Sequence, residues 1–224
     1  MTVREFTSAA TLLICLTASA AAQDGPSAPA AQPQSFGDFE KAKEVPAGAP
    51  KAFEFELSDF SYHVGANGNG RREGGGLTRR FNLRLDSGEA ITHVYFSKYA
   101  GDLLLVCEVA YGDGGRAFVA RLEQPSMRAR WKQRVPGKGV AAAREAAALY
   151  LAAMGFVGRL DLRSGAYLWK HDDISKTNGP PAFESFELPE LRGDTVSFKE
   201  AGVTGRAAKT IVVNKKTGKI IRVE

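Results

Sequence analysis

Short alternating strands, frequent glycine turns and a repeat of about forty residues predict an all-β fold of about four propeller-like blades of antiparallel strands. The strand signal is period-two alternation, as at Phe53, Phe55 and Leu57, which are separated by polar residues. The turn signal is the succession of glycine clusters that begins at Gly65. Many short strands with few helical periods are typical of a sandwich, a barrel or a propeller.

Residues 1–22 have the order of a secretory signal peptide. A weakly charged start leads into the apolar run 9–16, and small residues follow as far as Ala22. The apolar run is shorter than the roughly 20 residues of a transmembrane helix. We therefore expect cleavage before Gln23 and an exported protein, periplasmic or extracellular.

Residues 23–50 are predicted to form a disordered linker rich in Pro and Ala, and residues 51–224 a β-propeller-like domain. Cleavage after Ala22 leaves Cys107 as the one cysteine, so no disulfide can form within the mature chain. Cys107 ends the apolar run 103–107, where a small buried hydrophobe is expected rather than a nucleophile.

Residues 65–76 are predicted as turn, with a strand following from Thr78 to Leu85. Residues 140–154 are rich in Ala and would be helical by propensity. The repeat places a strand at 147–154, and we follow the repeat.

The repeat is a frame that begins with an acidic or amide residue, has Ser-Gly or Thr-Gly three and four positions later, and ends on Trp. Residues 161–169 match it fully, whereas 123–131 have Met in place of Gly and 214–222 end on Arg. A shortened copy is placed at 85–88. Asp or Asn can accept hydrogen bonds from nearby backbone amides, and Gly takes the positive φ of the turn.

Trp131 and Trp169 repeat at the period of about 40 residues that four-stranded propeller blades show. The longer last interval indicates an insertion at 171–189. Four blades form either a small closed ring or an incomplete, open stack that must protect its edges. A non-repeating sandwich is the alternative.

The frame, fully present at 161–169, resembles the PQQ-like β-propeller repeat of quinoprotein dehydrogenases and outer-membrane assembly scaffolds. The resemblance covers roughly residues 100–224 and implies that the Trp residues dock neighbouring blades. The resemblance does not extend to the catalytic site of those dehydrogenases, because their vicinal cysteine pair has no counterpart in this chain. We therefore predict no catalytic, cofactor-binding or metal-binding residues and no cofactor.

Each residue or segment that could bind a metal ion or a phosphate also has a purely structural explanation. His63, His93 and His171 are far apart in sequence and lack ligand partners at strand spacing. Asp172-Asp173 could touch a cation, but a solvated loop is expected there. The glycine-rich stretch 65–70 leads into a strand rather than a helix, which favours a hairpin over a phosphate loop.

We therefore expect a non-enzymatic binding or scaffold module of the cell envelope, with an envelope or extracellular protein as partner. The net charge of +5 and the basic runs 71–72, 79–80 and 128–134 also suit an anionic envelope polymer, while export excludes nucleic acid. A homo-oligomer is expected if blade edges stay open. The alternative is a secreted enzyme or carbohydrate-binding protein with a site built from loops, including Asp113, Arg116 and His171.

Overall fold

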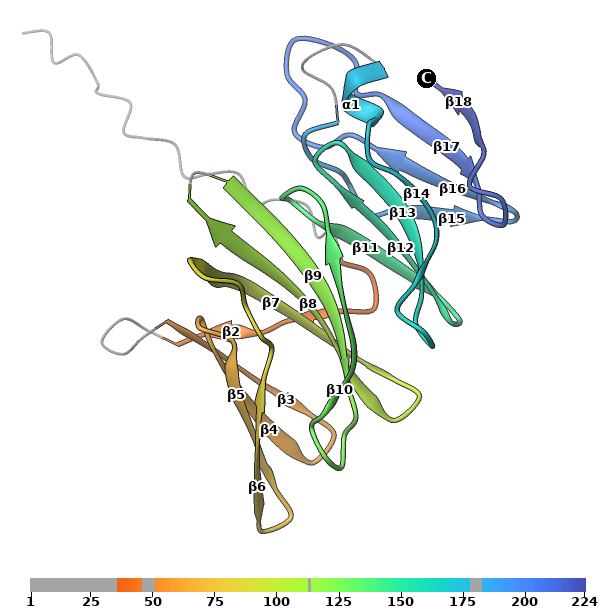
Figure 1. The fold of residues 1–224 in the computed structure, drawn as a ribbon. Helices are drawn as coiled ribbons and strands as arrows, with labels where there is room; N and C mark the ends of the chain where they lie inside the picture. The colour runs from red at the N-terminus through yellow and green to blue at the C-terminus, as the bar shows by residue number, and fades with distance from the viewer. Residues whose placement is uncertain (1–35, 46–50, 113, 178–182) are drawn as a thin grey trace, which may run out of the picture. The chain divides into compact units, whose positions relative to one another are not determined.

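The computed structural model describes residues 36–45, 51–112, 114–177 and 183–224. The predicted signal peptide and residues 23–35 of the predicted linker lie outside this described part. Within it the fold is all-β, with four separate antiparallel sheets of four or five strands, as predicted (Figure 1). Among the described residues, no helix is long and apolar enough to cross a membrane.

Each sheet contains a four-stranded meander, which we call a blade. Blade 1 comprises β3 (Ala52–Leu57), β4 (Phe60–Gly65), β5 (Asn69–Gly74) and β6 (Leu77–Asn82). Blade 2 comprises β7 (Glu89–Tyr99), β8 (Asp102–Tyr111), β9 (Gly114–Leu122) and β10 (Ala129–Val135). Blade 3 comprises β11 (Ala141–Glu145), β12 (Ala148–Ala153), β13 (Phe156–Asp161) and β14 (Tyr167–His171). Blade 4 comprises β15 (Glu190–Arg192), β16 (Thr195–Lys199), β17 (Thr210–Asn214) and β18 (Ile220–Val223).

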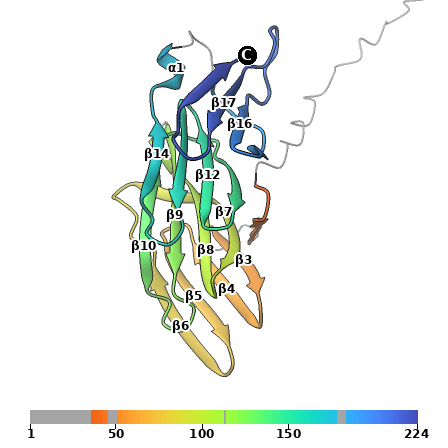
Figure 2. The ribbon, with the colours of Figure 1, turned by 90° about the vertical axis from the view of Figure 1, so that its right-hand side faces the viewer.

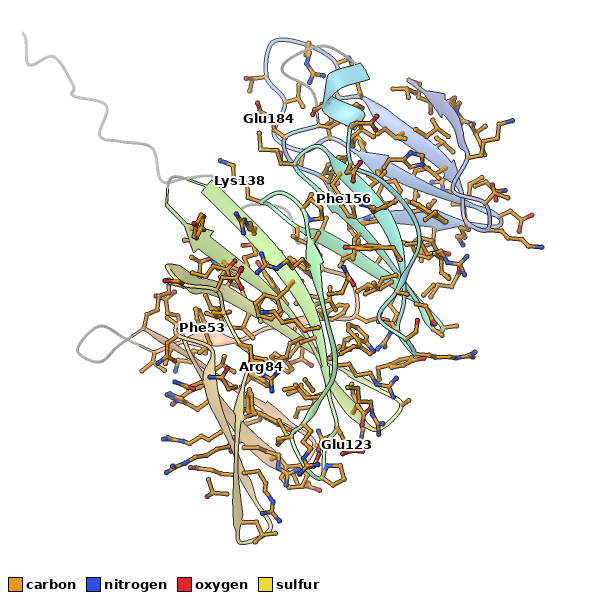
Figure 3. All side chains as sticks on the ribbon, in the orientation of Figure 1. Phe53, Arg84, Glu123, Lys138, Phe156 and Glu184 are labelled. Carbon is orange, nitrogen blue, oxygen red and sulfur yellow. The ribbon has the colours of Figure 1, made fainter. Side chains whose placement is uncertain are left out.

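The core lies between successive blades. One apolar cluster, which includes Phe53, joins blades 1 and 2, and a second, which includes Phe156, joins blades 2 and 3 (Figure 3). A third cluster joins blades 3 and 4. In the described part of the chain no such cluster joins blade 4 to blade 1, so the four blades form an open stack rather than a ring or a sandwich.

Strand β8 shows why the run 103–107 is apolar without alternation. Leu103, Leu105 and Cys107 face blade 1, whereas Leu104 and Val106 face blade 3. A strand buried on both faces needs apolar residues at every position. Cys107 is fully buried and unpaired, as expected, and burial raises the pKa of its thiol.

The Ala-rich segment is strand, as the repeat predicted. β12 pairs with β13 along its whole length and with β11 from Ala148 to Ala152, and all six of its residues are buried. Its alanines pack on both neighbouring blades, Ala152 toward blade 4 and Ala153 toward blade 2. Tertiary packing therefore overrides the helical propensity of this segment.

Residues 36–45, expected to belong to the linker, instead form a strap along the first strands of three blades. Phe36 bridges Ala142 of blade 3, β1 (Glu40–Lys41) pairs with β7, and β2 (Lys43–Glu44) pairs with β3. Three apolar strap side chains are buried: Phe36, Phe39 and Ala42. The linker prediction fails here because these pairings are long-range and leave no local pattern.

The Trp residues dock neighbouring blades, as the resemblance implied. Trp131 Nε1 donates to the Leu162 carbonyl (3.2 Å), and Trp169 Nε1 donates to the Lys215 carbonyl (2.8 Å). Both carbonyls belong to the residue after the first position of the next frame. A Cβ on Gly165 would lie 2.6 Å from the Trp131 ring, so glycine is required where the indole lies.

An arginine reinforces each of these contacts. Arg121 donates to the same Leu162 carbonyl (3.0 Å), and Arg159 to the same Lys215 carbonyl (2.8 Å). Arg121 and Arg159 each precede the docking Trp by the same interval, on the third strand of their blade. Between blades 1 and 2, Arg72 alone donates to the equivalent carbonyl, that of Gln124.

Three predictions for the first half of the chain are wrong. Residues 85–88 are not a copy of the repeat, because they lie in the connection from β6 to β7 and not between third and fourth strands. Residues 65–76 are not continuous turn, because β5 lies within them. The strand expected at 78–85 ends at Asn82, and Arg84 follows with a φ of 48°.

The predicted insertion at 171–189 connects β14 to β15 and includes the short helix α1 (Ile174–Thr177). Phe183 and Phe186 are buried in the cluster between blades 3 and 4. The Asn-Gly-Pro-Pro stretch that marked this insertion in the sequence lies outside the described residues.

Candidate binding surface

The three histidines lie in three different environments. His63 Nδ1 lies 3.2 Å from Glu54 Oε1 in blade 1, and His93 Nδ1 lies 2.9 Å from Glu108 Oε2 in blade 2. His171 Nε2 lies 2.7 Å from the Gly218 carbonyl and joins blades 3 and 4. In the described residues no group of three His, Cys, Asp or Glu side chains is placed to hold a metal ion.

The residues considered for a loop-built site do not converge. Arg116 packs over the Tyr111 ring and lies 3.7 Å from Glu89, all within blade 2. His171 serves the contact to blade 4, and Asp113 lies outside the described residues. Asp172 Oδ2, directly after β14, accepts a hydrogen bond from Lys170 of that strand (2.8 Å).

The basic run on β10 is used inside the fold. Arg130 lies 2.7 Å from the buried carboxylate of Asp102, and Arg134 contacts Asp86. Lys132 donates to two backbone carbonyls of the connection before β7 (2.7 and 2.9 Å), and burial lowers its pKa. This run therefore positions the connection between blades 1 and 2 and offers little free positive charge.

The basic runs of blade 1 are arranged differently. In the β5–β6 hairpin, Arg71 lies directly opposite Arg80, and Arg72 lies directly opposite Arg79. We call these two strands the arginine hairpin; it lies at the lower end of Figures 1 and 2. Like charges directly opposite each other destabilise a strand pair, so two such pairs cost the fold stability.

Part of this charge is compensated within the protein. Arg72 is buried, lies over the Phe60 ring and donates to Gln124. Arg71 Nε lies 3.0 Å from Glu73 Oε1.

Arg79 and Arg80 are the unpaired half of the hairpin. Both are exposed, and neither has an ion-pair partner among the described residues. Nitrogen-tipped side chains extend outward from blade 1 in Figure 3. The arrangement therefore places two guanidinium groups where a partner from outside can reach them.

The outward face of blade 1 is polar and shallowly hollowed. Directly paired positions form a row across the sheet: Lys43, Glu54, His63, Arg71 and Arg80. A hollow of about 400 Å³ lies over the part of this row on β2 to β5. Glu54 and Glu56 of this face lie on β3, and Glu73 lies on β5 beside Arg71. Strand β6 contributes arginines and no acidic residue, so positive charge is concentrated at its edge.

Guanidinium groups bind carboxylates and phosphates through two parallel hydrogen bonds. The fold and this surface define the class of the protein: an all-β stack of four propeller-like blades with a cationic edge on its first blade. The sequence showed the arginine pairs as basic runs. The register that sets them opposite each other could not be predicted, because residues 65–76, which contain β5, are predicted as turn.

No protein-family model matches the chain, and no curated protein matches it. Thirty-eight chains of solved structures do. One is a europium-containing methanol dehydrogenase, with 18% identity over 55% of this chain and 24% of that chain and a TM-score of 0.38. Another is the computationally designed Ika8 protein, with 14% identity over 76% of this chain and 48% of that chain and a TM-score of 0.46. The chain thus spans about a quarter of the first and about half of the second.

Proposed function

We propose that this protein is an exported, non-enzymatic binding module of the cell envelope, periplasmic or extracellular, that binds an acidic partner protein through its arginine hairpin. The observation that carries the proposal is the two directly opposed arginine pairs of β5–β6, in which Arg79 and Arg80 are exposed and have no ion-pair partner among the described residues. Carboxylates of a partner would relieve the repulsion that the hairpin carries alone.

A binding role is also supported by how the reactive side chains are used. Cys107 is buried in the core between blades 1 and 2, and His171 contacts the turn of blade 4. Both groups serve packing between blades. Export is supported by the signal-peptide pattern of residues 1–22.

The test is a binding titration with labelled poly-L-glutamate at low and at physiological salt. A double substitution, Arg79→Gln with Arg80→Gln, should weaken binding about 5–10-fold at low salt, since each exposed charge contact is worth up to about 1 kcal/mol. The matched control is Arg128→Gln, which removes one exposed arginine from the turn before β10. The control should bind like the wild type.

Equal binding by the wild type and the double variant would refute the proposal. Dextran sulfate serves as the second probe, because it carries anionic groups on a polysaccharide. Binding to dextran sulfate without binding to poly-L-glutamate would overturn the protein partner in favour of an anionic envelope polymer.

A further inference from the structure

Strand β6 is the last strand of its sheet. The strand order is β2-β3-β4-β5-β6, and among the described residues no strand pairs with the far side of β6. Five of its six residues are exposed, and only Phe81 is buried. In blades 2 and 3 the last strand carries a docking Trp, whereas Asn82 stands at that position in β6 and bonds to Asn69 (2.6 Å). The edge of β6 is thus free of the docking role.

The turn of the hairpin determines which backbone groups this edge presents. Gly75 and Gly76 form a two-residue turn with φ values of 60° and 73°, as a type I′ turn requires. Such a turn is closed by a hydrogen-bonded pair, here Gly74 and Leu77. Because hydrogen-bonded pairs alternate along antiparallel strands, the N–H and C=O groups of Thr78, Arg80 and Asn82 point away from β5.

The charges lie on both sides of this edge. Arg80 is on the outward face of blade 1 with Arg71, and Arg79 is on the opposite face with Arg72. A strand added beside β6 would place its side chains about 4.5–5.5 Å from these arginines, on alternate faces. Acidic residues in that strand would therefore meet a guanidinium group on either face.

We propose that an extended acidic segment of the partner protein adds to blade 1 as a further strand alongside β6. The inference rests on the proposed function and specifies its binding mode. Main-chain hydrogen bonds to Thr78, Arg80 and Asn82 supply affinity, and the arginines select an acidic strand. Charged residues on an edge also protect it against uncontrolled pairing, so a neutral strand is excluded by the same side chains.

The first experiment uses the unaltered full mature chain and two peptides of equal charge. One is an eight-residue peptide of alternating Glu and Val, and the other is the same peptide N-methylated on the amides of one edge. The unmodified peptide should bind at least about 10-fold more tightly, because N-methylation removes the main-chain donors. Hydrogen exchange at Thr78, Arg80 and Asn82 should slow when the unmodified peptide is bound.

The two levels of the proposal fail differently. Equal binding of both peptides, with weaker binding by the Arg79→Gln and Arg80→Gln variant, would overturn strand addition and leave the proposed function intact. If neither peptide binds and the arginine variant binds poly-L-glutamate normally, the proposed function fails as well.

The second experiment changes the protein without changing its charge. Thr78→Pro removes an N–H that faces away from β5, so it leaves the β5–β6 ladder whole. It should lose binding to the peptide at least about 10-fold and keep its binding to dextran sulfate, with Thr78→Val as the matched control. Circular dichroism and a melting temperature equal to those of Thr78→Val show that the Thr78→Pro hairpin has folded. Wild-type peptide affinity in Thr78→Pro would overturn the inference.

Discussion

The indole of Trp169 lies directly against Gly218, so closely that a Cβ on that glycine would stand 2.5 Å from the indole Cγ. The two residues belong to successive blades, and the Trp169 indole also donates to the carbonyl of Lys215 in the same turn. The Trp of one frame thus packs against the Gly of the next frame. This pairing explains why Trp and Gly recur together at a fixed spacing.

Replacing Trp169 tests this docking contact. Trp169→Ala should lower the free energy of unfolding by about 3–5 kcal/mol, because it leaves a cavity between blades 3 and 4 and removes one of the two hydrogen bonds to the Lys215 carbonyl. Urea unfolding followed by circular dichroism measures the loss. Trp131→Ala should cost less, because Trp131 is only partly buried. Trp169→Ala unfolding like the wild type would contradict the blade assignment.

The stability that comes from the contact between Gly218 and the indole can be separated from the stability that comes from the glycine's backbone conformation. Gly218 and Gly101 have φ values of 74° and 84°, but nothing lies within 4 Å of a Cβ built on Gly101. Gly101→Ala should cost about 1–2 kcal/mol from backbone conformation alone. Gly218→Ala should cost clearly more, because the indole must also move. Equal losses in urea unfolding would show that the indole does not depend on the glycine.

The repeat could be predicted from the sequence because each turn is held by its own residues. Asp161 accepts hydrogen bonds from the Arg163 amide (3.1 Å) and the Ser164 hydroxyl (2.8 Å). Asn214 Oδ1 likewise accepts hydrogen bonds from the backbone amide and the hydroxyl of Thr217. Local contacts of this kind leave a fixed spacing in the chain.

The rest of the stack is held by contacts between distant residues. Phe36 pairs with Ala142, and Lys43 with Glu54, so the strap has no local signature. Blade 1 has no frame, because its third and fourth strands are joined by the two-residue turn of Gly75 and Gly76. The arginine hairpin could be predicted as basic but not as a surface, since the faces of its arginines follow from the register of β5 and β6.

Protonation of Glu200 should weaken the fold in acid. Its side chain is 1% exposed; burial alone would raise its pKa, but hydrogen bonds from Arg206 and from the Phe183 and Lys209 amides lower the pKa to about 2. A lowered folded-state pKa stabilises the protein above the ordinary value of 4.5, and this contribution is lost as the pH falls toward 2.

Glu200→Gln should therefore lower the melting temperature at neutral pH, by the equivalent of about 1–3 kcal/mol. Its deficit relative to the wild type should shrink below pH 4.5. Glu190→Gln, at an exposed position, should melt like the wild type at each pH. A deficit for Glu200→Gln that stays constant from neutral pH down to pH 2 would contradict the assigned pKa.

The two ends of the stack lack the parts that join blades. At the positions of the docking arginine and Trp, blade 4 has Val212 and Arg222, and blade 1 has the short turn of Gly75 and Gly76 in place of an acceptor frame. Docking of blade 4 onto blade 1 through this contact, within one chain or between two, would need the donors at one end and the acceptor at the other.

The expected homo-oligomer stays a prediction, and the outer faces of the two end blades favour the opposite outcome, a monomer. Its outer blade faces are polar: Glu54, His63 and Arg71 on blade 1, and Glu190, Ser197 and Arg222 on blade 4. Polar outer faces on terminal repeats keep an open stack from associating. Light scattering on the mature chain should give the mass of a single chain over a wide concentration range. A stable dimer would mean that the blade edges, rather than these faces, determine association.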